Sequence, residues 1–482
     1  MKSIYIKLSF ALLLAVTVSC SDYLDVNDSI DNPNLNQLTP NELIVGAQTK
    51  TANTFANRLN RVGNWMGVAW SGNYLDFNDA YGDESRYQFS STFYNDVWDD
   101  LYTNISNFST IEKFKDGRNW DNQIAAAKIL KAFYFQYIVD LYGDVPFSQA
   151  FDNDILFPQY DDSKDIYVDL ITSIDEAIDL IDSNPDSESF VVSDITFGGD
   201  MDQWKAFGNT VKLRFLIRLA SAGDANLSSF VNTQFASLSG AQFLNEDVKI
   251  NPGYSNSDNR QNPFWEVYGF DPTGIPTGRG RQTGPSEFAF ILLNNSGDAR
   301  LNALWKDNNG DFVGTKQNGT GRAASIGDGI LVGPDADLPI MLAAESYFLQ
   351  AEAVERGYLS GDAKALFDLG IQASFSSLGA GSAATYITNT DSDAVLGYNG
   401  GDALGAIMTQ KWIALTSVSG AELWIEYNRT GYPDVPLPES SSDPNIPVRL
   451  LYPASEYSGN SRNVPGQQRS DAFNSKIFWD VN

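Results

Sequence analysis

Apolar side chains recur at helical spacing along most of this chain, and this periodicity is its strongest constraint on folding. Within residues 121–142 an apolar side chain returns at every third or fourth position, as at Ala126, Leu130, Phe133, Tyr137 and Leu141. Such spacing places these side chains on one face of an α-helix, and that face must be buried against another element. Gly143 is suited to end the helix, and Pro146 prevents its continuation.

The same pattern predicts further helices. They extend from Ser163 to before Pro185, from Trp204 to Gly223, from about Leu338 to Arg356, from Ala363 to about Phe375, and from Ala403 to Leu415, followed by AELWIEYNRTGYP. Paired antiparallel helices of this length are typical of tetratricopeptide-like stacking, although the chain shows no strict internal repeat. The expected fold class is mostly α, with a helix-pair superhelical scaffold over about residues 40–235 and 336–430.

Two regions depart from this pattern. Between about residues 240 and 335, Gly, Asn, Pro and Asp crowd together in stretches such as NPGYSNSDNRQNPFWEVYGFDPTGIPTGRGRQTGP. Irregular chain inside a helical protein usually forms functional surface, so we expect this loop-rich region to bind a ligand. From Gly431 to residue 482 the Pro- and Ser-rich tail is expected to wrap over the helices in extended form.

The N-terminus has the pattern of an exported lipoprotein. Lys2 and Lys7 precede the apolar run from Leu8 to Val18, which is too short to span a bilayer but suits a secretory signal peptide. Cys20, the single cysteine of the chain, stands where lipidation and cleavage would make it the first mature residue. We therefore predict a signal peptide over residues 1–19, lipid attachment at Cys20, and one mature domain over residues 20–482; an ordinary signal peptide with an incidental cysteine is the alternative.

The composition excludes several classes of function. The chain has 61 acidic and 32 basic residues and a formal net charge of −29, which loss of the two leader lysines would lower to −31. Such a surface repels nucleic acid and lacks a polybasic face for membranes. The ten Trp, 22 Tyr and 29 Phe exceed what a core requires and favour stacking on the apolar faces of sugar rings.

Catalytic and cofactor motifs are scarce. The chain has no histidine, which excludes Ser-His-Asp catalysis and His-based zinc sites. The GxGxxA match at residues 319–324 follows a polar run rather than a buried strand and is predicted to be a loop. Asp307–Asp311 begins like a calcium loop but has Phe312 in place of the required glycine, so we interpret it as a surface turn. No cofactor and no enzymatic activity are predicted, although a glycosidase using two carboxylates stays open on residue type.

Six mature segments in sequence, besides the start CSDYLDVND, resemble one family, the SusD/RagB-type nutrient-binding lipoproteins of the Bacteroidetes outer membrane. They are DLYGDVPFSQAF, WKAFGNTVKLRFLIRLA, GPSEFAFILLNNSGDARL, LPIMLAAESYFLQAEAVERG, AELWIEYNRTGYPDVPLP and IPVRLLYPASEYSGNSRNV. Much of this shared pattern has a structural explanation, since Trp204 and Arg214 are expected to lock one helix against its neighbours. The resemblance implies a tetratricopeptide-like scaffold, a SusC-like TonB-dependent transporter as partner, and an oligosaccharide or peptide as cargo.

One candidate ligand-binding stretch is NWMGVAWSGNY with the residues that follow it. Trp65, Trp70 and Tyr74 could stack on sugar rings, and Asn73 and Asp76 could orient a ring on Trp70. Because the two tryptophans are five positions apart, a regular helix would not present both on one face. The alternative is that both are core tryptophans.

The second candidate stretch is NPFWEVYGF with the arginines that follow it. Trp265, Tyr268 and Phe270 lie in the glycine-rich region, where loops bury fewer aromatic side chains. Arg279 and Arg281 could bind sugar hydroxyls or a carboxylate, but in so acidic a chain we expect them to pair with neighbouring aspartates.

The function expected is capture of a glycan at the cell surface, on the outside of the outer membrane, and its delivery to the transporter without chemistry. The alternatives are a peptide-binding member of the same family, a carboxylate-based surface glycosidase, and a structural lid that binds only its transporter.

Overall fold

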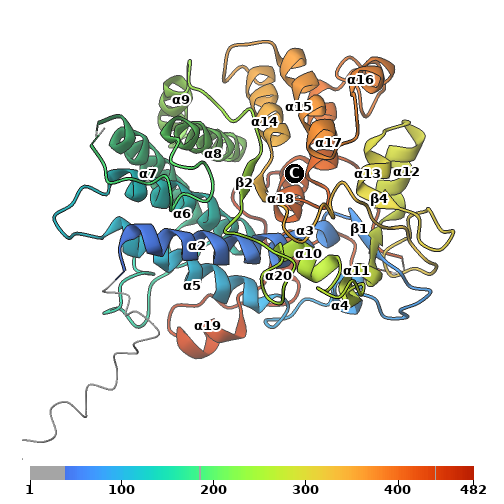
Figure 1. The fold of residues 1–482 in the computed structure, drawn as a ribbon, viewed down its shortest axis with the longest axis horizontal. Helices are drawn as coiled ribbons and strands as arrows, with labels where there is room; N and C mark the ends of the chain where they lie inside the picture. Colours follow the sequence, from blue (N-terminus) through green and yellow to red (C-terminus); the bar gives the residue numbers. More distant parts are fainter. Residues whose placement is uncertain (1–37, 184–185, 440) are drawn as a thin grey trace, which may run out of the picture.

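The computed structural model describes residues 38–183, 186–439 and 441–482 (Figure 1). The predicted signal peptide and the lipidation site at Cys20 lie outside the described residues. No helix within the described ranges is both long enough and apolar enough to cross a bilayer.

Long helices form the body of the molecule, and most pack against the next helix along the chain. They are α2 (Pro40–Thr54), which continues through a π-helical turn (Phe55–Leu59) into α3 (Asn60–Met66), α5 (Asn95–Glu112), α6 (Asp121–Tyr142), α7 (Ser163–Ser183), α8 (Met201–Ala222), α9 (Ser228–Ser237), α14 (Ala343–Glu355), α15 (Ala363–Ser377), α17 (Ala403–Leu415) and α18 (Gly420–Thr430). Helix α8 contacts α14, and α3 contacts α18, so the N-terminal and C-terminal helices form one scaffold.

Short elements lie mainly at one edge, on the right in Figure 1, or in the tail. The short helices are α4 (Gly82–Ser85), α10 (Pro263–Tyr268), α11 (Gly278–Gln282), α12 (Glu287–Asn295), α13 (Arg300–Leu304), α16 (Ala384–Thr390), α19 (Ala454–Gly459) and α20 (Asp471–Asn474). The strands of the described ranges form antiparallel pairs: β1 (Trp70–Gly72) with β3 (Thr283–Pro285), β2 (Val248–Ile250) with β6 (Leu338–Met341), and β4 (Trp305–Lys306) with β5 (Ser325–Ile326).

Most of the predicted helices are confirmed within a few residues. Helix α6 ends at Tyr142, and Gly143 follows in a positive-φ conformation (+83°) that favours glycine. Helix α8 begins at Met201, three residues before the predicted start, because the Asp200 carboxylate accepts hydrogen bonds from the backbone N–H groups of Asp202 (3.0 Å) and Gln203 (3.2 Å).

The predicted helix over Leu338–Arg356 is wrong in its first turn. Leu338–Met341 forms strand β6, and the helix α14 begins only at Ala343. A four-residue apolar run is compatible with either a helix or a strand. Here it forms a strand because it pairs with β2, with Val248 opposite Met341 and Ile250 opposite Leu338.

A buried ionic network fastens the helices together. Arg218 on α8 lies 2.6 Å from Asp140 on α6 and 2.6 Å from Glu422 on α18, with all three side chains at 0% exposure. Arg429 on α18 lies 2.7 Å from Glu352 on α14. Arg214 donates from Nε to Glu345 at 2.8 Å, so the predicted role of Arg214 in locking α8 to its neighbours is confirmed.

The C-terminal tail is attached to this network. The indole N–H of Trp479, a fully buried side chain, donates to the Asp140 carboxylate at 2.7 Å. The Leu450 N–H also donates to the Leu141 carbonyl oxygen at 2.7 Å, just before α6 ends. Burial raises the pKa of Asp140 to about 6, because desolvation of the carboxylate outweighs the attraction of Arg218.

Candidate functional site

Strands β1 and β3 bring together the two stretches that the sequence singles out, although more than 180 positions separate them. Trp70 pairs with Pro285 and Gly72 pairs with Thr283. Beyond this register, the Asn73 N–H donates to the Gln282 carbonyl oxygen at 2.9 Å, and the Asn73 side chain donates to the Arg281 carbonyl oxygen at 3.2 Å. The segment after β1 therefore lies against α11.

The aromatic residues of the first stretch are buried. Trp65 and Trp70 are each 0% exposed, and the indole N–H of Trp70 donates to the Ser417 hydroxyl at 2.8 Å. Tyr74 is also buried, and its hydroxyl accepts the Asn318 N–H at 2.9 Å. These residues have the core role that the sequence left open as the alternative, and they offer no open ring face to a sugar.

The polar residues of the first stretch form a surface network. The Asn73 side chain donates to Asp76 Oδ2 at 2.9 Å, and Arg322 Nε lies 3.0 Å from the same oxygen. Hydrogen bonds from Arg322 and then from Asn73 lower the pKa of Asp76 to about 2. Asn73 is buried, whereas Asp76 is exposed and stays ionised at every physiological pH.

The second stretch divides between core and surface. Tyr268 is buried, and its ring lies 5.2 Å from that of Trp70. Trp265 and Phe270 are half-buried, with ring centroids 5.5 Å apart. The Asn262 side chain begins α10 by accepting the Phe264 N–H at 2.9 Å, which fixes the helix that carries Trp265.

Arg279 and Arg281 lie exposed on α11. The guanidinium carbon of Arg279 lies 4.8 Å from the ring centroid of Tyr81, and that of Arg281 lies 5.6 Å from the ring centroid of Phe77. Neither arginine lies within 4.0 Å of a carboxylate of the described chain, whereas Arg86 and Arg322 each lie within 3.0 Å of an aspartate. The predicted pairing of Arg279 and Arg281 with aspartates is therefore wrong. Stacking on an aromatic ring replaces it.

A polar cleft of about 520 Å³ opens beside these arginines. It is lined by Asp79, Tyr81, Gly82, Asp83, Glu84, Gly278, Arg279 and Gln282. Carboxylates, a guanidinium and a carboxamide converge here, and these groups suit hydrogen bonding to hydroxyl-rich ligands.

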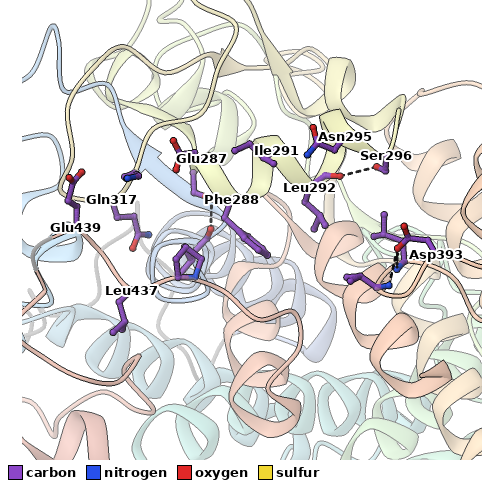
Figure 2. A pocket seen from close by; sticks show the side chains of 16 residues that line it. Glu287, Phe288, Ile291, Leu292, Asn295, Ser296, Gln317, Asp393, Leu437 and Glu439 are labelled. Atoms are coloured by element: carbon purple, nitrogen blue, oxygen red, sulfur yellow. Dashed lines mark hydrogen bonds between the residues drawn. The ribbon is translucent and has the colours of Figure 1, made fainter. Parts of the chain in front are cut away.

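A larger apolar cleft of about 610 Å³ lies at the other end of the β1–β3 pair (Figure 2). Its lining includes Phe288, Ile291 and Leu292 on α12, with Leu437 and Glu439 on the tail segment opposite (Figure 2), together with Val68, Ser286, Glu287, Asn295, Ser296, Lys316, Gln317, Asp393, Val395, Leu396 and Pro436. None of these residues was predicted from sequence as a ligand contact. The sequence signal that could have indicated this cleft is the apolar run FAFILL at residues 288–293. In the structure, Ile291 of this run is 46% exposed.

The floor of the apolar cleft contains a strained residue. Val68 has a φ of +58°, which a β-branched residue rarely adopts. The Ser286 hydroxyl donates to the Val68 carbonyl oxygen at 2.6 Å and thereby holds this conformation. Strain of this kind persists where surrounding contacts fix the backbone, often at binding sites.

The described ranges contain no group of three or more acidic, histidine or cysteine side chains placed to hold a metal ion. The segment Asp307–Asp311 forms the predicted turn, in which Asp307 Oδ1 accepts the Gly310 N–H at 2.9 Å.

Together, the paired-helix scaffold and the clefts at its loop-rich edge define a tetratricopeptide-like helical protein with clefts open to solvent. The family described as "Starch-binding associating with outer membrane", SusD-like, matches residues 32–453. The chain therefore belongs to the SusD-like family of outer-membrane-associated proteins, as the resemblance of its motifs predicts.

Solved structures share this fold over nearly the whole chain. A chitin-binding protein is 24% identical, with 92% of this chain and 100% of that chain covered and a TM-score of 0.73. A chitin-binding SusD homolog from Flavobacterium johnsoniae is 22% identical over 91% of this chain and 99% of its own, with a TM-score of 0.73. A SusD/RagB family protein from Bacteroides thetaiotaomicron is 19% identical over 92% and 99%, with a TM-score of 0.71. None of the curated proteins matches the chain.

Proposed function

We propose that this protein binds a glycan at the outer surface of the cell and delivers it to a SusC-like TonB-dependent transporter for import. In this proposal lipid at Cys20 anchors the protein to the outer membrane, and the single domain over residues 20–482 performs no chemistry. Membership of a family described as starch-binding supports a glycan as the ligand, and two similar structures are described as chitin-binding.

The pairing of β1 with β3 is the observation that carries the proposal. It places the polar cleft, lined by Asp83, Arg279 and Gln282, next to the surface helices α10 and α11. Hydrogen-bonding groups of this kind suit sugar hydroxyls, and the half-exposed rings of Trp265 and Phe270 suit the apolar face of a pyranose.

Isothermal titration of the detergent-purified lipoprotein tests this function. Chitin and starch oligosaccharides are the first ligands, since the family and its solved relatives are described as binding these polymers. Binding of either, weakened in Gln282→Ala and unchanged in the distant surface variant Gln234→Ala, supports the proposal. No binding to any glycan of a broad panel overturns it.

Two further assays separate the alternatives. Release of reducing sugar over hours favours the carboxylate-based glycosidase. Recovery of the transporter in a pull-down, with no glycan bound and uptake unaffected by cleft variants, favours the structural lid.

A peptide is the second candidate cargo, and the apolar cleft favours it. Phe288, Ile291 and Leu292 could contact apolar side chains of a peptide, whereas a glycan has no such side chains to bury there. Binding of apolar peptides that Ile291→Asp abolishes, without binding of glycans, would establish this function instead.

A further inference from the structure

The two arginines of α11 belong to the minority of arginines in the described chain that pair with no carboxylate. Acidic residues outnumber basic ones by 61 to 32, so a guanidinium on this surface has many carboxylates available. Arg86, Arg322 and Arg469 each lie within 3.0 Å of a carboxylate. Arg279 has no carboxylate within 4.0 Å in the described chain, and its only side-chain acceptor there is Gln282 Oε1 at 3.4 Å.

The carboxylates that line the same cleft already have donors. Asp79 lies 2.6 Å from Arg86, and Glu84 accepts the Tyr94 hydroxyl at 2.7 Å. Asp83 accepts from the Gln88 carboxamide at 3.0 Å in the orientation that satisfies both amide atoms. Arg279 therefore keeps most of its five N–H donors for a molecule from outside.

Arg279 is also held in place before any ligand arrives. The Thr283 hydroxyl donates to the Arg279 carbonyl oxygen at 2.8 Å, and the guanidinium lies on the Tyr81 ring. Gly280 allows this arrangement, because a Cβ there would lie 2.1 Å from the Tyr268 carbonyl oxygen. A fixed guanidinium loses little entropy on binding, which favours a planar, bidentate partner.

We propose that Arg279 binds an anionic group of the ligand, so that the glycan bound under the proposed function is acidic and carries a uronic acid. The carboxylate of a uronic acid matches the guanidinium fork through two parallel N–H···O bonds. Gln282 and Asp83 then bind neighbouring hydroxyls in a cleft of about 520 Å³.

The net charge of the whole protein limits which acidic glycans can bind. A net charge of −29 repels densely charged polyanions at long range, so the attraction of Arg279 acts only at contact. The ligand is therefore a glycan with sparse carboxylates, such as a neutral backbone with single uronic acid branches, rather than a polyuronate or a heavily sulfated chain.

Titration with a matched pair of ligands tests the inference. The probes are a xylo-oligosaccharide with one glucuronic acid branch and the same molecule with its carboxyl reduced to the alcohol. We expect the acid to bind about tenfold to a hundredfold more tightly, the span typical of a charge-assisted pair. A monosulfated xylo-oligosaccharide tests whether Arg279 prefers sulfate to carboxylate. Tighter binding of the sulfated ligand would overturn the inference that the ligand carries a uronic acid.

Three variants connect the effect to Arg279. Arg279→Gln should remove the preference for the acid over the reduced form, while Arg279→Lys should restore only part of that preference because the fork is lost. Arg462→Gln is the matched control, since Arg462 is exposed and lies over the Phe157 ring at 4.3 Å far from the cleft. Thermal unfolding confirms that each variant is folded.

The outcomes separate this inference from the proposed function. Equal affinity for the acid and the reduced form, or an unaltered preference in Arg279→Gln, overturns the inference and leaves glycan binding standing. Absence of binding to both forms and to every neutral glycan overturns both. Binding of a peptide with a free C-terminal carboxylate, lost on amidation, assigns Arg279 to a peptide and overturns the acidic glycan.

Discussion

Arginines serve opposite purposes in two regions of this molecule. In the helical core, Arg218 has 0% side-chain exposure and lies 2.6 Å from both Asp140 and Glu422. At the loop-rich edge, Arg279 is exposed and has no carboxylate within 4.0 Å in the described chain. Both guanidiniums also lie near aromatic rings, Arg218 at 6.0 Å from Trp479 and Arg279 at 4.8 Å from Tyr81.

The difference follows from solvation. A buried guanidinium must have its charge compensated within the protein, because an unpaired charge in the interior costs several kcal/mol. An exposed guanidinium is solvated by water and can exchange that water for a ligand at little cost. Buried arginines therefore specify how the helices pack, whereas the exposed pair is available for recognition.

Removal of a core arginine should give the largest loss of stability. Arg218→Met leaves Asp140 and Glu422 buried without their common partner, and we expect a loss of about 3–5 kcal/mol in the free energy of unfolding. Urea denaturation followed by circular dichroism measures it. Arg462→Met, an exposed arginine, should stay within about 0.5 kcal/mol of wild type. Equal stability of the two variants would mean that the network contributes nothing.

Titration of Asp140 should make the stability of the core depend on pH. Its pKa is raised to about 6 in the folded protein, against about 3.9 for an unfolded chain. A raised pKa adds stability below pH 4 that is lost as the pH rises through 6, on the order of 3 kcal/mol for a shift of this size.

Asp140→Asn should therefore flatten the profile of unfolding free energy between pH 4 and pH 7. Denaturation midpoints of wild type and variant across that range measure the slope. Asp402→Asn, at an exposed carboxylate, should leave it unchanged. A wild-type profile parallel to that of Asp140→Asn would show that Asp140 does not titrate in this window.

Loss of the bond between the tail and the core should have a smaller effect. Trp479→Phe keeps most of the buried ring but removes the indole N–H that donates to Asp140 at 2.7 Å. We expect destabilisation of about 1–3 kcal/mol, the cost of leaving a buried acceptor short of a donor. Hydrogen exchange should also show faster opening of residues 471–482. Trp120→Phe is the comparison, because the Trp120 indole donates at 2.9 Å to the Asp116 carboxylate, which is exposed and can be solvated by water when the donor is lost.

The helices of the core could be predicted from sequence because their signals are local. The apolar stripe of residues 121–142 and the glycine at position 143 each act within one or two turns. The cap at Asp200 is equally local but was not recognised, so α8 begins three residues before its predicted start. Strand β6 could not be predicted, since a four-residue run takes its state from a partner 90 positions away.

The candidate site was predictable by residue type but not by exposure. Trp65 and Trp70 are aromatic in the right segment, yet α3 packs so closely on α18 that a Cβ at Gly63 would lie 2.0 Å from the Gly420 backbone. Trp65 packs on the ring of Tyr81 and Trp70 on that of Tyr268, with centroids 4.8 and 5.2 Å apart, so both indoles lie in the core. The free guanidinium of Arg279 was equally unpredictable, since it depends on which carboxylates the fold places nearby. The meeting of both stretches at β1–β3 rests on long-range pairing that periodicity does not encode.

The smallest effect on stability is expected where an edge arginine does have a partner. Arg322 lies 3.0 Å from Asp76 at the exposed surface, so Arg322→Gln should leave the thermal midpoint unchanged within error. The same variant should raise the pKa of Asp76 from about 2 toward its ordinary value, and only in part, because Asn73 still donates to the carboxylate. Carbon-detected NMR titration of the Asp76 carboxyl measures this shift, with Asn73→Ala as the complementary variant. A pKa that stays near 2 in Arg322→Gln would show that edge arginines do not control the charge of their neighbours, and the contrast with the core would then rest on burial alone.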